Sequence, residues 1–190
     1  NIIVLPLVIP ILTGILLVFL HRHVKTQRWI SIIATILNIV ISFIILQKIQ
    51  VEGILKLDFG GWIAPYGITF VADSFAVLLV LTANFVTAIC LIYAMFSIGE
   101  KREKLFFYPF VHLLVAGVNG SFLTGDLFNL FVCFEVMLLA SYALITHGGT
   151  RIQLRESIKY IVINVLSSSL FVIAIAYLYG SIGTLNLAHP

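Results

Sequence analysis

The sequence predicts an all-α membrane protein, a polytopic bundle of transmembrane helices. Of its 190 residues, 61% are hydrophobic and only 10% are charged, and the mean hydropathy is +1.15. A soluble domain carries about 25% charged residues, so 11 Lys and Arg with 8 Asp and Glu are too few to cover a folded surface in water. This composition excludes a soluble enzyme, a nucleic-acid-binding protein and a disordered tail.

Six apolar runs are long enough to cross a hydrocarbon layer of about 30 Å, which needs about 20 residues of helix. They span residues 2–20, 29–46, 74–96, 106–124, 127–145 and 160–179. The first run lacks a basic leader and further runs follow it. We therefore expect a permanent helix there rather than a signal peptide.

The basic residues alternate with these spans and predict the orientation in the membrane. Eight lie in the loops after the first, third and fifth spans: Arg22, Lys25, Arg28, Lys101, Arg102, Lys104, Arg151 and Arg155. Only Lys48 and Lys56 lie on the opposite side. Loops rich in Lys and Arg stay in the cytoplasm, so we expect the N-terminus and the last residues outside. The net charge of +3 then reflects topology rather than an acidic partner.

The connection between the second and third spans, residues 48–72, is longer than the others. Residues 54–59 partly alternate between apolar and polar side chains, and a pair of glycines and Pro65 follow as turn residues. We expect a short extended or hairpin segment on the outer face, with Trp62 and Tyr66 at the membrane interface.

Glu135 lies near the middle of its span. It is one residue from the centre of residues 127–145, about 1.5 Å along the helix axis, and cannot reach either interface. Its apolar neighbours offer no local partner, so the carboxyl group is either neutral or faces a cation or water held by another helix. Such residues usually mark a functional site. The alternative is a protonated structural carboxyl group, hydrogen-bonded across helices.

Lys159 and His112 are further candidates for proton transfer. Lys159 lies at the cytoplasmic start of the sixth span, where snorkelling to water explains it equally well, and Glu156 is placed one turn earlier to pair with it. His112 lies in the fourth span, with Asn119 two turns later on the same face. Histidine relays protons near neutral pH or serves as a hydrogen-bonding strut, and the sequence leaves both open.

Other polar residues near the spans have structural explanations. Asn164 and the serines at 167–169 either let helices pack closely or hold water. Asp73 and Asp126 fit helix starts, and Asp126 with Asn129 resembles an N-cap. The alternative for Asp126 and Asn129 is a polar entrance leading toward Glu135.

Several kinds of chemistry lack their motifs. The sequence contains no P-loop, no dinucleotide-binding glycine pattern, no CxxC and no paired haem histidines. Cys90 and Cys133 lie in apolar runs and suggest neither a disulfide framework nor a metal site. We therefore expect no cofactor and no metal, with energy coupling through ion gradients, voltage or a partner subunit.

Five segments carry a family resemblance. They are FYPF at 107–110, GVNGSFLTGDLFNLFVCFEVMLLASY at 117–142, DFGGWIAPYGI at 58–68, QLRESIKYIVIN at 153–164 and GTLN at 183–186. Together they strongly resemble the D subunit of the bacterial Mrp-type (Mnh-type) Na⁺/H⁺ antiporters. That family is related to the antiporter-like proton-pumping subunits of respiratory complex I.

The resemblance implies a bundle of about fourteen helices built with an inverted repeat, of which this chain would hold the N-terminal part. It implies that Glu135 matches a glutamate essential for transport, whose usual lysine partner lies on a helix that would follow Pro190. Lys159 matches a lysine thought to influence that glutamate or the proton route. The implied partners are the other subunits of an Mrp-type complex and the lipid bilayer, with protons and Na⁺ as transported ions.

The leading hypothesis is a proton-translocating subunit of a multisubunit Na⁺/H⁺ antiporter complex in the bacterial cell membrane, and not an enzyme. Glu135 would bind and release a proton, Lys159 would tune it and His112 would feed it from the cytoplasm. The alternative is a membrane-arm proton-pumping subunit of an NADH-quinone oxidoreductase-like complex, since the two families share this core. A third hypothesis is a scaffold in which Glu135 is a strut.

Overall fold

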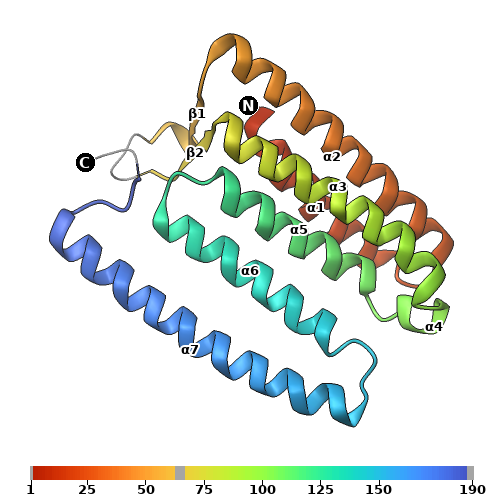
Figure 1. Cartoon of the computed structure of the whole chain (residues 1–190). Coiled ribbons are helices and arrows are strands. Elements are labelled where there is room, and N and C mark those ends of the chain that lie inside the picture. The colour runs from red at the N-terminus through yellow and green to blue at the C-terminus, as the bar shows by residue number, and fades with distance from the viewer. Residues whose placement is uncertain (1, 63–66, 188–190) are drawn as a thin grey trace.

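The computed structural model describes residues 2–62 and 67–187 (Figure 1). In chain order its elements are α1 (Leu5–Phe19), α2 (Val24–Glu52), β1 (Leu55–Asp58), β2 (Thr69–Ala72), α3 (Ser74–Ser97), α4 (Glu100–Glu103), α5 (Phe107–Leu123), α6 (Leu127–Ile145) and α7 (Arg151–Ile182). Short 3-10 turns precede α1 at Ile2–Val4 and follow β1 at Phe59–Gly61. The predicted helical membrane architecture is confirmed.

Among the described residues, five helices are long and apolar enough to cross a membrane: Ile2–Phe19, α2, α3, α6 and α7. The predicted span 106–124 is the apolar but shorter α5, whose 17 residues are at the lower limit for a span. α5 ends at Leu123 because Thr124 is extended and pairs with Phe70 of β2. The structure thus gives five long spans and one short one where the sequence predicts six.

Two helices begin earlier than the hydropathy pattern predicts. Their first turns carry charged side chains, which lower the local hydropathy and hide the helix start. α2 begins at Val24 rather than Trp29, and α7 begins at Arg151 rather than Tyr160. At the start of α7, Thr150 and Gln153 form a reciprocal capping box, which is a known sequence signature for a helix N-terminus. Lys159 consequently lies in the third turn of α7 and not at its start.

α5 lies at the centre of the bundle and packs against α1, α3 and α6, while α7 lies along the outer side of α6 (Figure 1). Within residues 151–182, only Ser157 and Ile175 are buried. The loops that follow α1, α3 and α6 lie at one end of the bundle, and the hairpin lies at the other. The basic loops are therefore gathered at a single end, as the predicted orientation requires.

The predicted hairpin within residues 48–72 is confirmed. β1 and β2 pair antiparallel, with Leu55 opposite Ala72. Trp62 is largely exposed, whereas Tyr66, the second predicted interface residue, falls outside the described residues.

Extended segments beside the hairpin fix how α6 and α7 lie together. The Gly125 N–H donates to the Thr69 carbonyl at 2.8 Å, and the Leu127 N–H donates to the Leu185 carbonyl at 2.9 Å. The Leu187 N–H donates back to the Gly125 carbonyl at 2.9 Å. The chain that leaves α7 is therefore held against the start of α6, which keeps the two helices antiparallel and side by side.

A cluster of three buried asparagines, Asn38, Asn84 and Asn119, ties four helices together. Pro10 lies inside α1 and has no N–H to donate to the Pro6 carbonyl four residues earlier. Asn119 and Asn38 donate to that carbonyl instead, at 2.8 and 3.2 Å. Asn84 accepts from Asn38 at 3.0 Å and donates to Asn119 at 3.2 Å. Because an unpaired carbonyl in hydrocarbon costs several kcal/mol, this asparagine cluster stabilises α1, α2, α3 and α5 as a unit.

Candidate functional site

The candidate site is built on α6, whose start is fixed by its own sequence. The Asp126 carboxylate accepts from the Asn129 backbone N–H at 2.8 Å and caps the helix. The 19 residues of α6 extend over about 28 Å, close to the thickness of the hydrocarbon layer. α6 begins and ends where the sequence predicts, so Glu135 lies at its middle.

The packing of α6 against α5 decides which way Glu135 points. A Cβ atom at Gly117 would lie 2.7 Å from the Cys133 carbonyl, and one at Gly120 would lie 2.7 Å from Cys133 Sγ. These glycines let α5 and α6 approach closely, with buried Cys133 between them. Glu135 follows Cys133 by two residues, about 200° round the helix. Its side chain therefore leaves the α5 interface and points into a pocket between α6 and α7.

Two aromatic contacts set the register of α6 against α7. The rings of Phe131 and Phe171 are 6.2 Å apart, and those of Tyr142 and Tyr160 are 5.7 Å apart. Because the helices are antiparallel, these contacts place Glu135 at the level of residues 167–168. The two helices touch through the aromatic pairs and leave a gap in side-chain packing between them.

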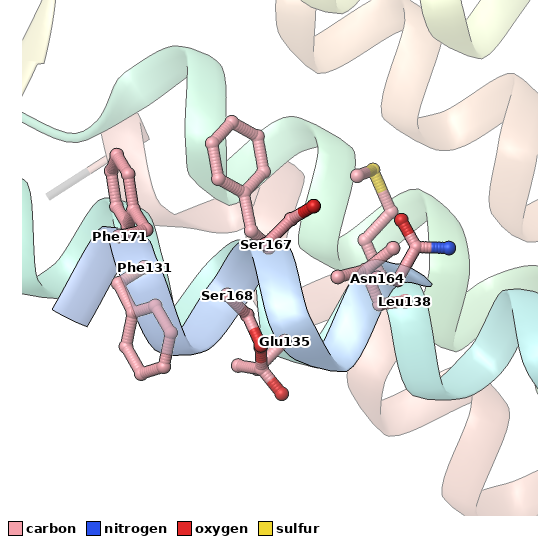
Figure 2. Close-up of a pocket in the computed structure, with 9 residues that line it drawn as sticks. Phe131, Glu135, Leu138, Asn164, Ser167, Ser168 and Phe171 are labelled. Atoms are coloured by element: carbon pink, nitrogen blue, oxygen red, sulfur yellow. The ribbon is translucent and has the colours of Figure 1, made fainter. Parts of the chain in front are cut away.

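That gap is a pocket of about 310 Å³ with an apolar wall and a polar strip. Its lining residues are Phe131, Phe134, Glu135, Met137 and Leu138 of α6 with Asn164, Ser167, Ser168 and Phe171 of α7. Figure 2 shows Glu135 and Ser168 in the middle of the pocket, between the aromatic end and the Asn164 end. At about 30 Å³ each, several water molecules fit in this volume.

The hydrogen bonds around the pocket leave the Glu135 carboxyl group unmatched. Glu135 Oε1 is buried and has no hydrogen-bond partner among the described residues. Across the pocket, Ser167 Oγ donates to the Ile163 carbonyl at 2.9 Å, and Asn164 Nδ2 donates to the Tyr160 carbonyl at 2.9 Å. Ser167 has used its one donor on α7 itself, and both side chains still have acceptor capacity, while Asn164 also keeps a second N–H. The strip can therefore accept a hydrogen bond from a protonated carboxyl group or from water beside it.

Lys159 is not brought to Glu135. Its ammonium contacts Glu156 at 2.8 Å, as the sequence predicts, and both side chains are more than half exposed. Lys159 lies eight residues before Ser167 on α7, about 12 Å along the axis.

His112 is not brought to the pocket either. It is buried on α5, where its Cβ atom lies 3.7 Å from the position of a Cβ at Gly14 of α1. Its Nε2 has no hydrogen-bond partner among the described residues. His112 therefore packs on the α1 side of α5, while the glycines that contact α6 lie on another side.

Asp126 and Asn129 have the structural role that the sequence predicts for them. The Asp126 side chain caps α6, and Asn129 Nδ2 donates to Thr124 Oγ1 at 2.9 Å. Neither residue lines the pocket of Glu135.

Sequence reasoning missed a buried ion pair between α2 and α4. Arg28 donates through two nitrogen atoms to the carboxylate of Glu103, each at 3.0 Å, and the Glu103 side chain is fully buried. The sequence predicts only a free loop charge at Arg28. No local pattern in the sequence links residues 75 positions apart. The asparagine cluster did have a sequence signal, because a single asparagine lies well inside each of three apolar spans.

His147 connects the turn after α6 to the start of α5. Its ring packs against Phe107 with centroids 5.6 Å apart, and its Nε2 is buried. Burial lowers the pKa of His147 and the charge of Arg102 lowers it further, while a hydrogen bond to the Arg102 backbone partly opposes this. The imidazole is therefore neutral at pH 7.

Known membrane proteins resemble this chain both in sequence and in fold. The family model described as "NADH:quinone oxidoreductase/Mrp antiporter, TM" matches residues 124–189. The D subunit of the Na⁺/H⁺ antiporter of Bacillus subtilis is 52% identical over 188 residues, which is 99% of this chain and 38% of that protein. The chain is a homologue of the D subunit of the Mrp-type Na⁺/H⁺ antiporters. It spans 38% of the length of this relative and of the corresponding antiporter protein of Alkalihalophilus pseudofirmus, to which it is 50% identical.

Solved structures extend the likeness to two kinds of membrane complex. A chain of the Mrp complex from Dietzia sp. matches with a TM-score of 0.90 and 30% identity, over 97% of this chain and 35% of that one. A chain of the archaeal membrane-bound sulfane sulfur reductase matches with a TM-score of 0.85 and 28% identity, over 98% and 39%. This antiporter-subunit homologue is thus a multi-pass membrane protein whose fold is shared by antiporter and respiratory complexes.

Proposed function

We propose that this chain is part of a proton-translocating subunit of a multisubunit Na⁺/H⁺ antiporter complex, and that Glu135 is its protonatable site. The observation that carries the proposal is the buried, unpartnered Oε1 of Glu135 facing a polar strip at the middle of α6. A carboxyl group in such a place changes its protonation when a nearby charge or water changes. The named relatives support antiport as the process served.

The basic end of the bundle is proposed to be cytoplasmic, which puts the hairpin outside. Protons would reach Glu135 along the α6–α7 pocket, because its polar strip and volume suit water. Lys159 would tune Glu135 from the neighbouring helix α7, by forming or breaking its ion pair with Glu156. The feeding role of His112 and the entrance at Asp126 and Asn129 receive no support from contacts with the pocket and remain predictions.

Glu135→Gln in the intact complex tests the proposal. Na⁺-dependent proton movement in membrane vesicles is expected to fall at least tenfold, because an amide of the same shape cannot release a proton. Glu52→Gln is the matched control, since Glu52 is exposed at the end of α2, and it should transport normally. Normal antiport by an assembled Glu135→Gln complex overturns the site. Reduced assembly with normal transport per complex supports the strut hypothesis instead.

The second candidate is a membrane-arm subunit of a redox-driven proton pump, favoured by the match to the sulfane sulfur reductase. The same protonatable carboxyl group would serve there. Purification of the native complex distinguishes the two, because a redox complex brings flavin and iron–sulfur subunits with it.

A further inference from the structure

A set of basic residues without ion pairs among the described residues lies around the turn between α1 and α2, at the end of the bundle that holds the basic loops. One groove of about 380 Å³ is lined by Arg22 from this turn, Lys25 from the first turn of α2 and Lys104 from the segment after α4. All three side chains are exposed, and none forms an ion pair within residues 2–62 and 67–187. Three cations that gather in one hollow and form no ion pair repel one another and attract an anion.

Glu100 is the one acidic residue that lines this groove. It offsets one of the three charges and leaves the groove net positive. The neighbouring Arg28 is different, because its charge is already matched by the bidentate pair with Glu103. The groove therefore keeps its attraction for an anion after the internal pairs are counted.

An apolar groove adjoins the basic one and shares Lys25 with it. This second hollow, of about 330 Å³, is lined by Lys25 and Arg28 at one side and by Trp29, Ile32 and Met95. Along α2, Trp29 and Ile32 lie one and two turns below Lys25, toward the membrane interior. Trp29 is 70% exposed, as tryptophans at the membrane–water interface commonly are. The two adjoining grooves thus form a continuous surface that is basic at one end and apolar at the other.

We propose that these grooves bind an anionic phospholipid, with its phosphate among Arg22, Lys25 and Lys104 and an acyl chain along Trp29, Ile32 and Met95. The charge of the first groove selects a negative headgroup over a zwitterionic one. The apolar lining of the second selects a lipid over a free anion. Basic hollows beside transmembrane helices are a recognised way to hold anionic lipids, and this site is separate from the pocket of Glu135.

The test uses the intact complex in nanodiscs of phosphatidylcholine with a minor fraction of phosphatidylglycerol, and native mass spectrometry counts the retained phosphatidylglycerol. Each basic residue at a membrane surface contributes about fivefold to binding of anionic lipid. The triple variant Arg22→Gln, Lys25→Gln, Lys104→Gln should therefore weaken retention on the order of a hundredfold. The matched triple Lys101→Gln, Arg151→Gln, Arg155→Gln removes three charges at the same end outside the grooves and should leave retention within about twofold.

Two further arms keep the outcome clear if the triple variant assembles poorly. Glu100→Gln removes an exposed carboxylate from the groove and should tighten phosphatidylglycerol binding about fivefold. Excess inorganic phosphate should not displace the lipid, and Trp29→Ala should weaken lipid retention. If inorganic phosphate displaces phosphatidylglycerol, the groove is a simple anion site and the lipid assignment is overturned. Equal losses in both triple variants, or no phosphatidylglycerol on the wild-type complex because another subunit covers the groove, also overturn it.

Discussion

Two glutamates, one fully buried and one with a single buried oxygen, show how the two halves of this bundle differ in the pairing of charge. Glu103 is fully buried and held by two nitrogen atoms of Arg28, in the region built from α1 to α5. Glu135, in the pocket between α6 and α7, has a buried oxygen without a partner among the described residues. A matched buried charge fixes structure, whereas an unmatched one is free to change its protonation. Burial alone therefore does not identify the functional candidate, and the state of the partner does.

The asparagine cluster supports the same distinction. Asn38, Asn84 and Asn119 donate to one another and to the Pro6 carbonyl. Single atoms such as Asn38 Oδ1 are left over, but a neutral acceptor costs less to bury than a carboxylate. The region from α1 to α5 thus holds the buried carboxylate of Glu103 in an ion pair and, within its described part, leaves only neutral groups such as His112 Nε2 without a partner. The α6–α7 region carries a carboxyl group without a partner among the described residues.

The largest expected effect on stability comes from breaking the matched pair. Arg28→Met leaves the fully buried Glu103 carboxylate alone, and the expected cost is about 3 to 5 kcal/mol. Glu103→Gln should cost less, because Arg28 is 25% exposed and can be hydrated. Thermal unfolding of the solubilised complex measures both. A smaller loss for Arg28→Met than for Glu103→Gln would contradict the assignment of Glu103 as the buried partner.

A smaller effect is expected from the asparagine cluster. Asn119→Leu removes a donor to the Pro6 carbonyl and an acceptor from Asn84, at a cost of about 1 to 2 kcal/mol. Asn164→Leu, on the pocket side, removes only a bond to its own helix and should cost less than about 0.5 kcal/mol. The same unfolding measurement compares them. Equal losses of unfolding free energy in the two variants would mean that Asn164 is bound as tightly as the asparagine cluster.

The smallest effect concerns the turn between α6 and α7, where His147 contacts Phe107 of α5. The pKa of His147 is below its ordinary value of 6.5. At a pH between the lowered pKa and 6.5, the open turn therefore binds more protons than the closed turn. The contact with Phe107 therefore stabilises the turn at pH 7 and weakens as the pH falls through the lowered value. Hydrogen exchange at residues 146–150, corrected for intrinsic rates, should rise on acidification. His147→Gln should remove that dependence, and an unchanged dependence would exclude His147 as its source.

The sequence predicts much of this arrangement where the signal is local. The ends of α6 follow from an apolar run and the cap at Asp126, so the predicted position of Glu135 at the middle of its helix is correct. The ion pair of Lys159 with Glu156 is one helical turn long and is also correct. The early starts of α2 and α7 were missed, because hydropathy ignores charged first turns even where a capping box is present.

Contacts between distant segments were beyond the sequence. Arg28 of α2 and Glu103 of α4 meet only in the folded bundle, and no periodicity links them. The same holds for His112, which the sequence places on the correct helix but cannot orient toward α1 rather than α6. The pocket itself depends on the rotation of α6 that Gly117 and Gly120 impose. This rotation follows from how the helices pack and not from the sequence of α6.

The most direct test is the protonation of Glu135 itself. Infrared difference spectroscopy of the reconstituted complex, with Glu135→Gln as the control, detects the carboxyl band of this one side chain. We expect a band that appears and disappears as the pH or the Na⁺ gradient is changed and that is absent from the variant. A Glu135 band that stays constant under every pH and gradient at which the complex transports would contradict the account.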